Sequence, residues 1–431
     1  MRVLTVVRNF GQRGTQRVAE NFSAAYARLE HDVRVLAFEH DGPRHGNYVE
    51  QGVEVLPAYA THPEEALRQV RTFEPELIHI HRSGVTNARE TQLLAELKRP
   101  HNCVLETNVF SRFDPEADAF IDLHAQLTLA GLFRWQCLEG GRSRGVGFYL
   151  PNLLNYEVWA PPAPEAKARW RAQLDIPHDA VVLGTIGKTH PGLAQVVEEV
   201  IASERKSQVR VFWVAIESEE TRGLIASLPK IVRTDCRLLP ATAEDRTLAE
   251  YYSLFDLLLH WSANGESFGM VLAESIAVGT PVVMPLQLHR DIGGVEVIGH
   301  EEGGWIAGSS RRLAFVCRQA IAALPQLRQN VHRAQARHQQ EYEMLAVASR
   351  ALVAAQTTLA RGVHRGQLAE ALQQAGFKVF VDEDWMSELT SRRLGARSTF
   401  EALLFRGTHN ALITDARRGV RALRLARRVR S

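Results

Sequence analysis

The sequence predicts an α/β protein whose domains are built on parallel β-sheets. Short apolar and β-branched segments alternate with longer segments of helical periodicity along most of the chain, a pattern typical of βαβ units and not of a β-sandwich. The chain has 431 residues, enough for two or three domains, and its 45% hydrophobic content can fill their cores. If two such sheets face each other, a ligand is expected between them at the carboxyl ends of the strands.

The first half of the chain opens with the elements of one such domain. Residues 3–7 are apolar and predict a buried strand, a loop bounded by Gly11 and Gly14 follows, and residues 15–29 have helical periodicity. A short glycine loop after a strand is a weak indication of a site when taken alone, because turns have the same composition.

Two later strand patterns carry polar residues. In residues 75–81, His79 and His81 alternate with isoleucine, so we expect one ring to point toward a ligand and the other to pack. For each of them a structural role is as frequent as a functional one. The strand predicted at residues 104–108 ends in Asn108, whose amide can hydrogen-bond a hydroxyl but cannot carry a proton.

The most informative segment lies in the second half, where a strand, a polar loop and a helix follow one another. Residues 257–260 predict the strand, 262–265 the loop, and 268–279 a helix that ends at a glycine. The positive end of the helix dipole would face the loop, which favours a phosphate or a polarised hydroxyl there. The free N–H groups at this end are those of Gly269, Met270 and Val271.

Two glutamates separated by seven residues flank the start of this helix. Glu266 lies ahead of it, whereas Glu274 lies about a turn and a half inside it, so their carboxylates would reach different parts of one ligand. Two acids on a solvated helix face are the ordinary alternative. The surrounding glycine, proline and serine residues favour ligand contact over that alternative.

This segment resembles the Glu, seven residues, Glu signature of retaining nucleotide-sugar glycosyltransferases of the GT-B type, the family four or glycosyl transferases group 1 enzymes. The resemblance extends over roughly residues 1–350, with further similar segments at 75–81, 150–152, 181–187, 249–256 and 293–296. It implies two facing Rossmann-like domains with parallel sheets. The implied parts are an acceptor-side domain 1–156, a nucleotide-sugar domain 157–340, a helix 341–360 that crosses back to the first domain, and a basic helical extension 361–431.

The resemblance also implies a reaction. A sugar would pass from a nucleoside-diphosphate sugar to a saccharide or lipid-linked acceptor with retention of the anomeric configuration, and no metal or other cofactor is required. Glu266 is expected beside the anomeric carbon as a catalytic residue, together with Asn108 and Lys188. The implied donor contacts are Gly14, Lys188, His190, Ser267, Phe268, Gly269, Met270, Val271 and, on the ribose hydroxyls, Glu274; the acceptor-side residues are Arg13, Arg17, His79 and His81.

The chain departs from the family where the donor diphosphate is expected. Relatives have an arginine just after the glycine that closes the first strand of the second domain and a lysine a few residues later. Here Lys188 follows Gly187, and the second base is lost near Pro191. An ammonium meets phosphate as a point charge and not as a fork, so the diphosphate would be held differently. The residues that could supply the missing charge are Arg13, Arg17 and His190.

A second departure is Asn108, at a strand end where family members often have a histidine. The change argues against a general base there, but retaining members are thought not to need one, because the leaving diphosphate oxygen can take the acceptor proton. Catalysis would then depend on positioning and charge stabilisation. The two departures keep open a GT-B protein that binds nucleotide sugar as an assembly partner without transferring it, and a GT-B epimerase that acts on the nucleotide sugar itself.

Basic residues concentrate at the carboxyl-terminal end. Residues 361–431 contain fourteen Arg and Lys against seven Asp and Glu, about +7, and the whole chain is +2, which leaves residues 1–360 at about −5. Residues 411–431 interleave arginines with apolar side chains, as a helix lying on an anionic membrane surface does. A tail helix packed on its own protein is an equally frequent alternative, and nucleic acid binding is not expected because aromatic residues are scarce there.

Two further features bear on location and metal use. The four cysteines lack metal-like spacing, and no apolar run is long enough for a signal peptide or a spanning helix, so we expect a cytoplasmic protein that contacts the inner membrane face peripherally if its tail binds lipid. Residues 377–384 predict a strand ending in Asp382 and Asp384, the metal-binding pattern of the other glycosyltransferase architecture. That interpretation is disfavoured because the preceding residues already form a different kind of unit.

Overall fold

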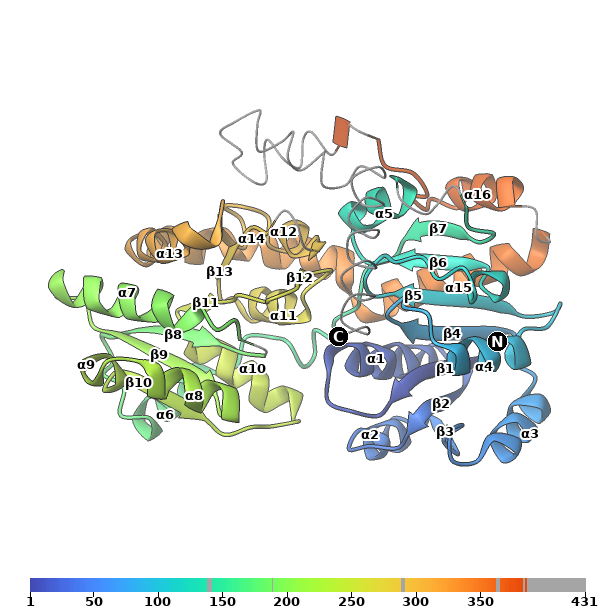
Figure 1. Cartoon of the computed structure of the whole chain (residues 1–431), viewed down its shortest axis with the longest axis horizontal. Helices are drawn as coiled ribbons and strands as arrows, with labels where there is room; N and C mark the ends of the chain where they lie inside the picture. Colours follow the sequence, from blue (N-terminus) through green and yellow to red (C-terminus); the bar gives the residue numbers. More distant parts are fainter. Residues whose placement is uncertain (138–141, 188, 288–290, 362–364, 383, 386–431) are drawn as a thin grey trace, which may run out of the picture. The chain divides into compact units, whose positions relative to one another are not determined.

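The computed structural model describes residues 1–137, 142–187, 189–287, 291–361, 365–382 and 384–385 (Figure 1). These residues form two compact units. The first contains Met1–Leu153 and the described chain from Met344 onward, and the second contains Leu154–Glu343. Each unit is an α/β structure with its own parallel sheet, as the alternation of strand and helix patterns predicts.

The first unit has a seven-stranded sheet in the order β3-β2-β1-β4-β5-β6-β7, with every strand parallel to its neighbours. Strands β4 and β5 are buried along their whole length, as expected for a parallel sheet covered on both faces. The strands are β1 (Arg2–Asn9), β2 (Asp32–His40), β3 (Glu54–Leu56), β4 (Leu77–Arg82), β5 (Cys103–Asn108), β6 (Leu123–Gln126) and β7 (Val146–Tyr149).

Helices cover this sheet. Helix α15, which follows the return of the chain from the second unit, packs against α1 and β5, so residues distant in sequence complete the first unit. The helices are α1 (Gly14–Arg28), α2 (His45–Glu50), α3 (Pro63–Phe73), α4 (Ala88–Leu97), the 3-10 helix η1 (Asp118–Phe120), α5 (Leu129–Trp135), α15 (Met344–Arg361) and α16 (Arg365–Gln374).

The second unit has a six-stranded parallel sheet in the order β10-β9-β8-β11-β13-β15 and a separate two-stranded pair, β12 with β14. Its strands are β8 (Val181–Thr185), β9 (Val211–Ile216), β10 (Cys236–Leu239), β11 (Leu257–Leu259), β12 (Gly265–Glu266), β13 (Val282–Pro285), β14 (Asp291–Ile292) and β15 (Gly304–Ala307). Its helices are α6 (Pro164–Gln173), α7 (Leu193–Lys206), α8 (Glu219–Ser227), α9 (Lys230–Arg233), α10 (Asp245–Leu254), α11 (Met270–Val278), α12 (Gly293–Ile298), η3 (Ser310–Arg312), α13 (Leu313–Ala322) and α14 (Leu324–Tyr342).

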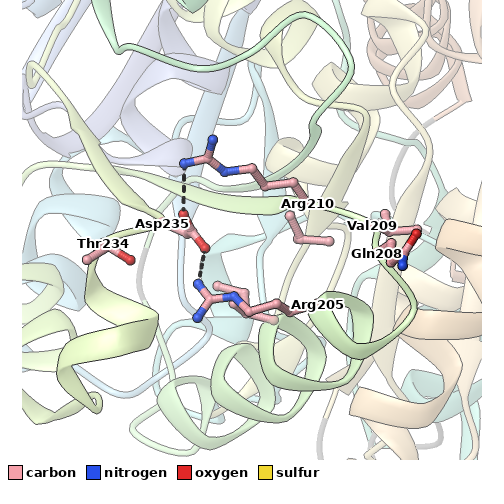
Figure 2. A pocket seen from close by; sticks show the side chains of 8 residues that line it. Arg205, Gln208, Val209, Arg210, Thr234 and Asp235 are labelled. Atoms are coloured by element: carbon pink, nitrogen blue, oxygen red, sulfur yellow. Dashed lines mark hydrogen bonds and ion pairs between the residues drawn. The ribbon is translucent and has the colours of Figure 1, made fainter.

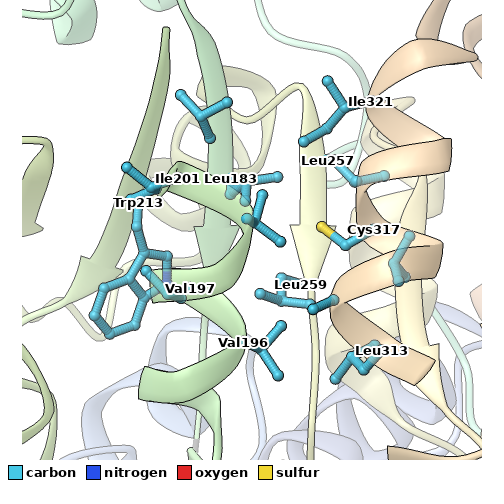
Figure 3. Packing of buried hydrophobic residues seen from close by; sticks show 14 of the residues in the cluster. Leu183, Val196, Val197, Ile201, Trp213, Leu257, Leu259, Leu313, Cys317 and Ile321 are labelled. Carbon is cyan, nitrogen blue, oxygen red and sulfur yellow. The ribbon is translucent and has the colours of Figure 1, made fainter. Parts of the chain in front are cut away.

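The core of the second unit lies between its sheet and the helices α7 and α13. Figure 3 shows Val197 of α7 and Cys317 of α13 among the strand side chains Leu183, Leu257 and Leu259, all of them fully buried. The apolar side chains of α7 recur at helical spacing, and this periodicity is what turns one face of the helix to the sheet. The packed core holds the carboxyl ends of β8 and β11 in fixed register.

Both sheets have the strand order of a dinucleotide-binding fold. In each, the order reverses between two neighbouring strands, β1 and β4 in the first unit and β8 and β11 in the second. The loops that follow these strands diverge to opposite sides of the sheet and leave a crevice at the carboxyl ends, where ligands of open α/β sheets bind. A ligand site in the second unit is therefore expected at the carboxyl ends of β8 and β11.

One sequence prediction about elements is refined and one is wrong. The helix expected at residues 341–360 is α15, which begins at Met344 because Glu343 has an extended backbone and separates it from α14. The N–H of Leu154 donates to the carbonyl of Tyr342 at 2.8 Å. This bond joins the two segments of chain that pass from one unit to the other. Residues 377–382 form no strand; their backbone instead meets β7 through one bond, from the Tyr149 N–H to the Lys378 carbonyl.

Candidate functional site

The start of α11 is open at the carboxyl edge of the second sheet. Gly269 precedes the helix with φ of 85°, a left-handed conformation that glycine adopts without strain. No side chain caps the helix within the described residues, and the N–H groups of Leu272 and Ala273 donate back to the Gly269 carbonyl. The N–H groups of Met270 and Val271 are left to point beyond the helix, as the sequence predicts, where an anion or a hydroxyl oxygen would be stabilised.

Glu266 lies directly in front of this helix. It belongs to β12, and its side chain is 24% exposed. Its Oε1 lies 2.9 Å from Nε2 of His260, the residue that follows β11. A Cβ on Gly294 would lie 3.1 Å from the Cβ of Glu266 and one on Gly269 would lie 3.4 Å away, so glycines on both sides let α11 and α12 approach the glutamate closely. The Glu266 side chain is therefore confined at its Cβ, and its carboxylate is partly exposed.

Glu274 lies on the second turn of α11 and is 1% exposed. Its Oε2 accepts a hydrogen bond of 2.9 Å from the hydroxyl of Tyr252, a fully buried residue of α10. The two glutamates thus differ as their spacing predicts: Glu266 is presented in the loop, and Glu274 is held inside the protein next to it.

The loop after β8 meets the first turn of α11. A Cβ on Gly187 would lie 3.6 Å from Cγ2 of Val271, so this turn faces the helix start. His190 stacks on Trp261 with ring centroids 4.0 Å apart, and its Nδ1 accepts from the N–H of Gly192. Burial lowers the pKa of His190, and a ring whose Nδ1 accepts is uncharged, so His190 does not supply the missing positive charge. Lys188 lies outside the described residues.

Ser267 and Phe268 complete the loop ahead of α11. Phe268 is buried and packs edge-on against Tyr342, with ring centroids 5.1 Å apart, so its side chain anchors the loop and only its backbone faces the helix start. Ser267 is half-buried between Glu266 and Phe268. The loop is thereby tied to the last residue of α14.

In the first unit, the loop after β1 surrounds the start of α1. Gly14 is the first residue of the helix, and Arg13, which precedes it, is exposed. The N–H of Arg17 donates to the Arg13 carbonyl. Oδ1 of Asn9 accepts from the N–H of Gly11, which shapes the loop that the sequence predicts here.

The two histidines of β4 lie on the same face of the strand and both are buried, so they do not divide between a ligand and the interior as the sequence predicts. Residues two apart on a strand share a face, and the rings of His79 and His81 are 4.2 Å apart at their centroids. His79 is fully buried between the Tyr26 hydroxyl and Thr107 Oγ1, each at 2.8 Å. Burial lowers the pKa of His79 well below its ordinary value and that of His81 to about 3. Both are neutral residues of the interior.

Asn108 closes a turn at the end of β5. Its Nδ2 donates to the Arg112 carbonyl at 2.6 Å and to Glu106 at 3.2 Å, and its Oδ1 accepts from the Arg112 N–H at 3.1 Å. The side chain is fully buried. The amide that the sequence predicts to meet a sugar is engaged with the protein on both of its polar atoms.

A buried ionic cluster surrounds this turn. Arg82, 3% exposed, donates to Glu106 at 3.0 Å and to Asp114 at 2.5 Å, and also pairs with Glu90. His124 bridges Glu106 at 2.5 Å and Asp118 at 3.1 Å. Burial alone would lower the pKa of His124, but the two carboxylates together raise it above its ordinary value. These charges cross-link β4, β5 and β6.

Comparison with known proteins bears on the second unit most directly. The family described as glycosyl transferases group 1 matches residues 178–324, which hold β8, the Glu266 loop and α11. The second unit belongs to this family. The fold of the chain is GT-B, with parallel α/β sheets of seven and six strands.

Curated proteins that match part of the chain are named as glycosyltransferases. The chain is 31% identical over 169 residues to a D-inositol 3-phosphate glycosyltransferase of Thermobispora bispora, which covers 35% of this chain and 39% of that protein. A protein of the same name from Streptosporangium roseum is 30% identical over 177 residues, covering 36% and 39%. The chain thus spans about two fifths of the length of these curated relatives.

Solved glycosyltransferase structures share the fold. HepE of Anabaena, solved with UDP and glucose, has a TM-score of 0.64 and 18% identity, and the match covers 83% of this chain and 100% of that one. A glycosyltransferase of Rickettsia africae has a TM-score of 0.65 and 12% identity, covering 84% and 99%. These likenesses extend the GT-B assignment beyond residues 178–324.

A pocket of about 360 Å³ in the glycosyl transferases group 1 unit lies away from the Glu266 loop (Figure 2). Its Asp235, 3% exposed, binds Arg205 at 2.5 Å and Arg210 at 3.4 Å. Arg210 and Asp235 directly precede β9 and β10, so this pocket lies at the amino ends of the strands. The expected donor site is at the opposite, carboxyl end.

The partners of the predicted residues are not apparent from the sequence. His260 and Tyr252 contact the two glutamates, yet they precede the signature on other elements and follow no spacing rule. Arg82 was overlooked although it follows the two histidines of β4 directly. The sequence indicates its importance in one way: an arginine at the end of a strand predicted to be buried needs a charged partner.

The predicted membrane-binding segment 411–431 lies outside the described residues. Within the described residues, no helix combines the length and the apolar character that crossing a bilayer requires. Asp382 accepts a hydrogen bond from the Trp385 N–H at 2.8 Å, which places it at a turn and not at a strand end.

Proposed function

We propose that the protein is a retaining glycosyltransferase that moves a sugar from a nucleoside-diphosphate sugar to a saccharide or lipid-linked acceptor. One observation carries the proposal: Glu266, the open start of α11 and the turn after β8 converge at the reversal of strand order in a unit of the glycosyl transferases group 1 family. That position is where a parallel α/β sheet binds a nucleotide.

The proposed roles follow from the environments of the two glutamates. The N–H groups of Met270 and Val271 hold the diphosphate at the positive end of the α11 dipole. Glu266 faces the anomeric carbon and stabilises the positive charge that grows there as the bond to the diphosphate breaks. Glu274, oriented by Tyr252, holds the ribose hydroxyls. The diphosphate oxygen accepts the acceptor proton, so no protein base is required.

The remaining positive charge for the diphosphate is proposed to come from Lys188, because His190 is neutral in the same loop. Arg13 and Arg17 of the first unit remain candidates for a second charge. Lys188→Ala should weaken donor binding about tenfold, the loss expected for one charged hydrogen bond. Titration of UDP into the purified variant measures this, and an unchanged dissociation constant would remove Lys188 from the site.

The experiment that tests the function is a thermal-shift panel followed by an activity assay. UDP, GDP and ADP and their glucose conjugates are added at increasing concentration, and a ligand at 100 times its dissociation constant adds about 2.7 kcal/mol to stability. UDP is the first choice because HepE of Anabaena binds it. Turnover is then measured as release of nucleoside diphosphate, with and without EDTA, and we expect no dependence on metal. No shift with any nucleotide would overturn the proposal.

A second candidate is a protein that binds nucleotide sugar without transferring it. The observation that favours it is the engagement of Asn108 with its own turn, which leaves the first unit without the polar group predicted to meet the acceptor. A stabilising shift with UDP-glucose but no release of UDP with any acceptor would favour this candidate. Conversion of the donor without acceptor would indicate an epimerase.

The lipid-linked acceptor is proposed from the basic segment after Asn410, which would hold the protein at the inner membrane face. Deletion of that segment should lower co-sedimentation with vesicles containing anionic lipid. Equal sedimentation of the truncated and full-length chains would leave a saccharide acceptor as the proposal.

A further inference from the structure

A histidine outside the Glu, seven residues, Glu signature contacts the glutamate that we propose to be catalytic. Nε2 of His260 lies 2.9 Å from Oε1 of Glu266. An ionised carboxylate can only accept hydrogen bonds, so Nε2 carries the proton and donates it. The imidazole is 5% exposed and the glutamate 24% exposed, so the contact lies at the boundary between the protein interior and the open loop.

The histidine is held by the sheet and not by the loop. It directly follows β11, and its backbone N–H donates to the Val283 carbonyl of the neighbouring strand β13 at 2.9 Å. Thr185 of β8, on the other side of β11, donates its hydroxyl to the carbonyl of the preceding residue, Leu259, at 3.1 Å. The ring is therefore attached to the rigid part of the second unit, whereas Glu266 belongs to a strand of two residues.

The carboxylate has one oxygen bound and one open. Oε1 is held by His260, and Oε2 has no protein partner within the part of the chain that the structure describes. The close approach of Gly269 and Gly294 to the Cβ of Glu266 limits the side chain from two further directions. An imidazole that fixes Oε1 therefore determines where Oε2 points.

We propose that His260 is a positioning residue for the reaction: it donates to Oε1 of Glu266 and so directs Oε2 at the sugar carbon that becomes positively charged. The inference rests on the proposed function, because it assigns His260 a role through Glu266. A carboxylate that is already oriented needs no rearrangement in the transition state, so the contact acts on turnover and not on binding of the donor.

The test compares two replacements of similar size in the full-length chain. His260→Gln retains an N–H donor, whereas His260→Met does not. We expect His260→Met to lower kcat for UDP release from UDP-glucose about tenfold or more with the donor KM within about twofold, and His260→Gln to stay within about threefold of wild type in kcat. His300→Gln, a histidine of the same unit that bonds the Ile306 N–H, is the matched control and should change neither constant.

A merely structural histidine would give a different pattern. Unchanged kcat in His260→Met, or equal loss in His260→Gln and His260→Met, would overturn the proposal. If His260→Met does not fold, the Gln variant decides alone: kcat near wild type supports the role, and a tenfold loss at unchanged melting temperature opposes it. In a Glu266→Gln background, His260→Met should cause no further loss, since the residue acts through the carboxylate; multiplied losses would oppose it.

Failure of the proposed function gives a separate signature. A wild-type protein that releases no nucleotide from UDP-, GDP- or ADP-glucose would remove the glycosyltransferase proposal and this inference with it. An active wild type with a fully active His260→Met variant would remove the inference alone.

Discussion

At the carboxyl ends of β4, β5 and β6, the first unit keeps its charged side chains paired with one another, whereas the loop after β11 in the second unit leaves Glu266 partly exposed. Arg82 and Glu106 are buried and bonded, and His124 is held between two carboxylates. Oε1 of Glu266 contacts His260, Oε2 has no partner among the described residues, and no side chain of those residues caps the helix behind it.

The two units show that one strand order can serve different purposes. Both sheets reverse their order at the same kind of position, yet polar groups at that edge stabilise the first unit and are available to a ligand in the second. The difference lies in the partners of each side chain and not in the topology, because function resides in sites that a fold carries. Five predictions test this comparison.

The largest effect is expected in the first unit. Arg82→Met would leave Asp114 as a buried charge without its ionic partner and Glu106 with His124 alone, and the free energy of unfolding should fall by about 3–5 kcal/mol. Urea denaturation measures the loss. Arg68→Met is the control and should lose far less, because Arg68 and Glu65 form an exposed pair that solvent screens. Equal small losses in both variants would show that the cluster is not structural.

In the second unit the corresponding change should affect turnover and spare stability. Glu266→Gln removes the charge that we propose faces the anomeric carbon, and kcat should fall about 100-fold. The melting temperature should change little, because the side chain is partly exposed. Glu301→Gln, a more exposed acid of the same unit, is the control for loss of a negative charge. A kcat within about twofold of wild type would contradict the role of Glu266.

The histidines of the first unit should respond to pH as interior groups. Burial lowers the pKa of His81 to about 3, so between the ordinary value of 6.5 and that value only the unfolded chain takes up a proton. Stability therefore falls as the pH falls below 6.5, by about 2 kcal/mol at pH 5. His81→Leu removes this term, so relative to wild type the variant should be more stable at pH 5 than at pH 8 by about that amount.

His124 provides the opposite case in the same unit. Its folded pKa is raised, so its contribution is present below the ordinary pKa and is lost as the pH rises through the folded pKa. His124→Leu should therefore be more destabilising at pH 5 than at pH 8. Denaturation of both variants at the two pH values checks the signs, and the same sign for both would contradict the opposite pKa shifts of His81 and His124.

The smallest effect is expected for Tyr252, which hydrogen-bonds Glu274. Tyr252→Phe removes one hydrogen bond to its carboxylate, and the donor KM should rise about fivefold with kcat within about twofold. Tyr251→Phe is the matched control, because the Tyr251 hydroxyl bonds the Pro240 carbonyl and not the glutamate. Equal donor KM values for the two variants would show that Tyr252 does not orient Glu274 for binding.

Much of the second unit follows from the sequence pattern. The strand β11, the loop with Glu266 and the helix with Glu274 are contiguous, and a residue spacing determines which turn of a helix each acid occupies. The crossing helix that the resemblance implies at residues 341–360 is α15, which begins at Met344, whereas helical periodicity alone does not mark the break at Glu343 because it continues across it. Hydrophobic periodicity identifies a helix but does not determine the residue at which it ends.

The sequence by itself determined the α/β class, the order of the elements and the two glutamates of the signature, since these depend on neighbours within a few residues. The tertiary structure alone decided that His260 holds Glu266 and that Tyr252 holds Glu274. Hydrogen-bond partners from different elements meet only when the sheet and its helices pack. The chemical role of a polar residue therefore depends on contacts that no spacing in the sequence records.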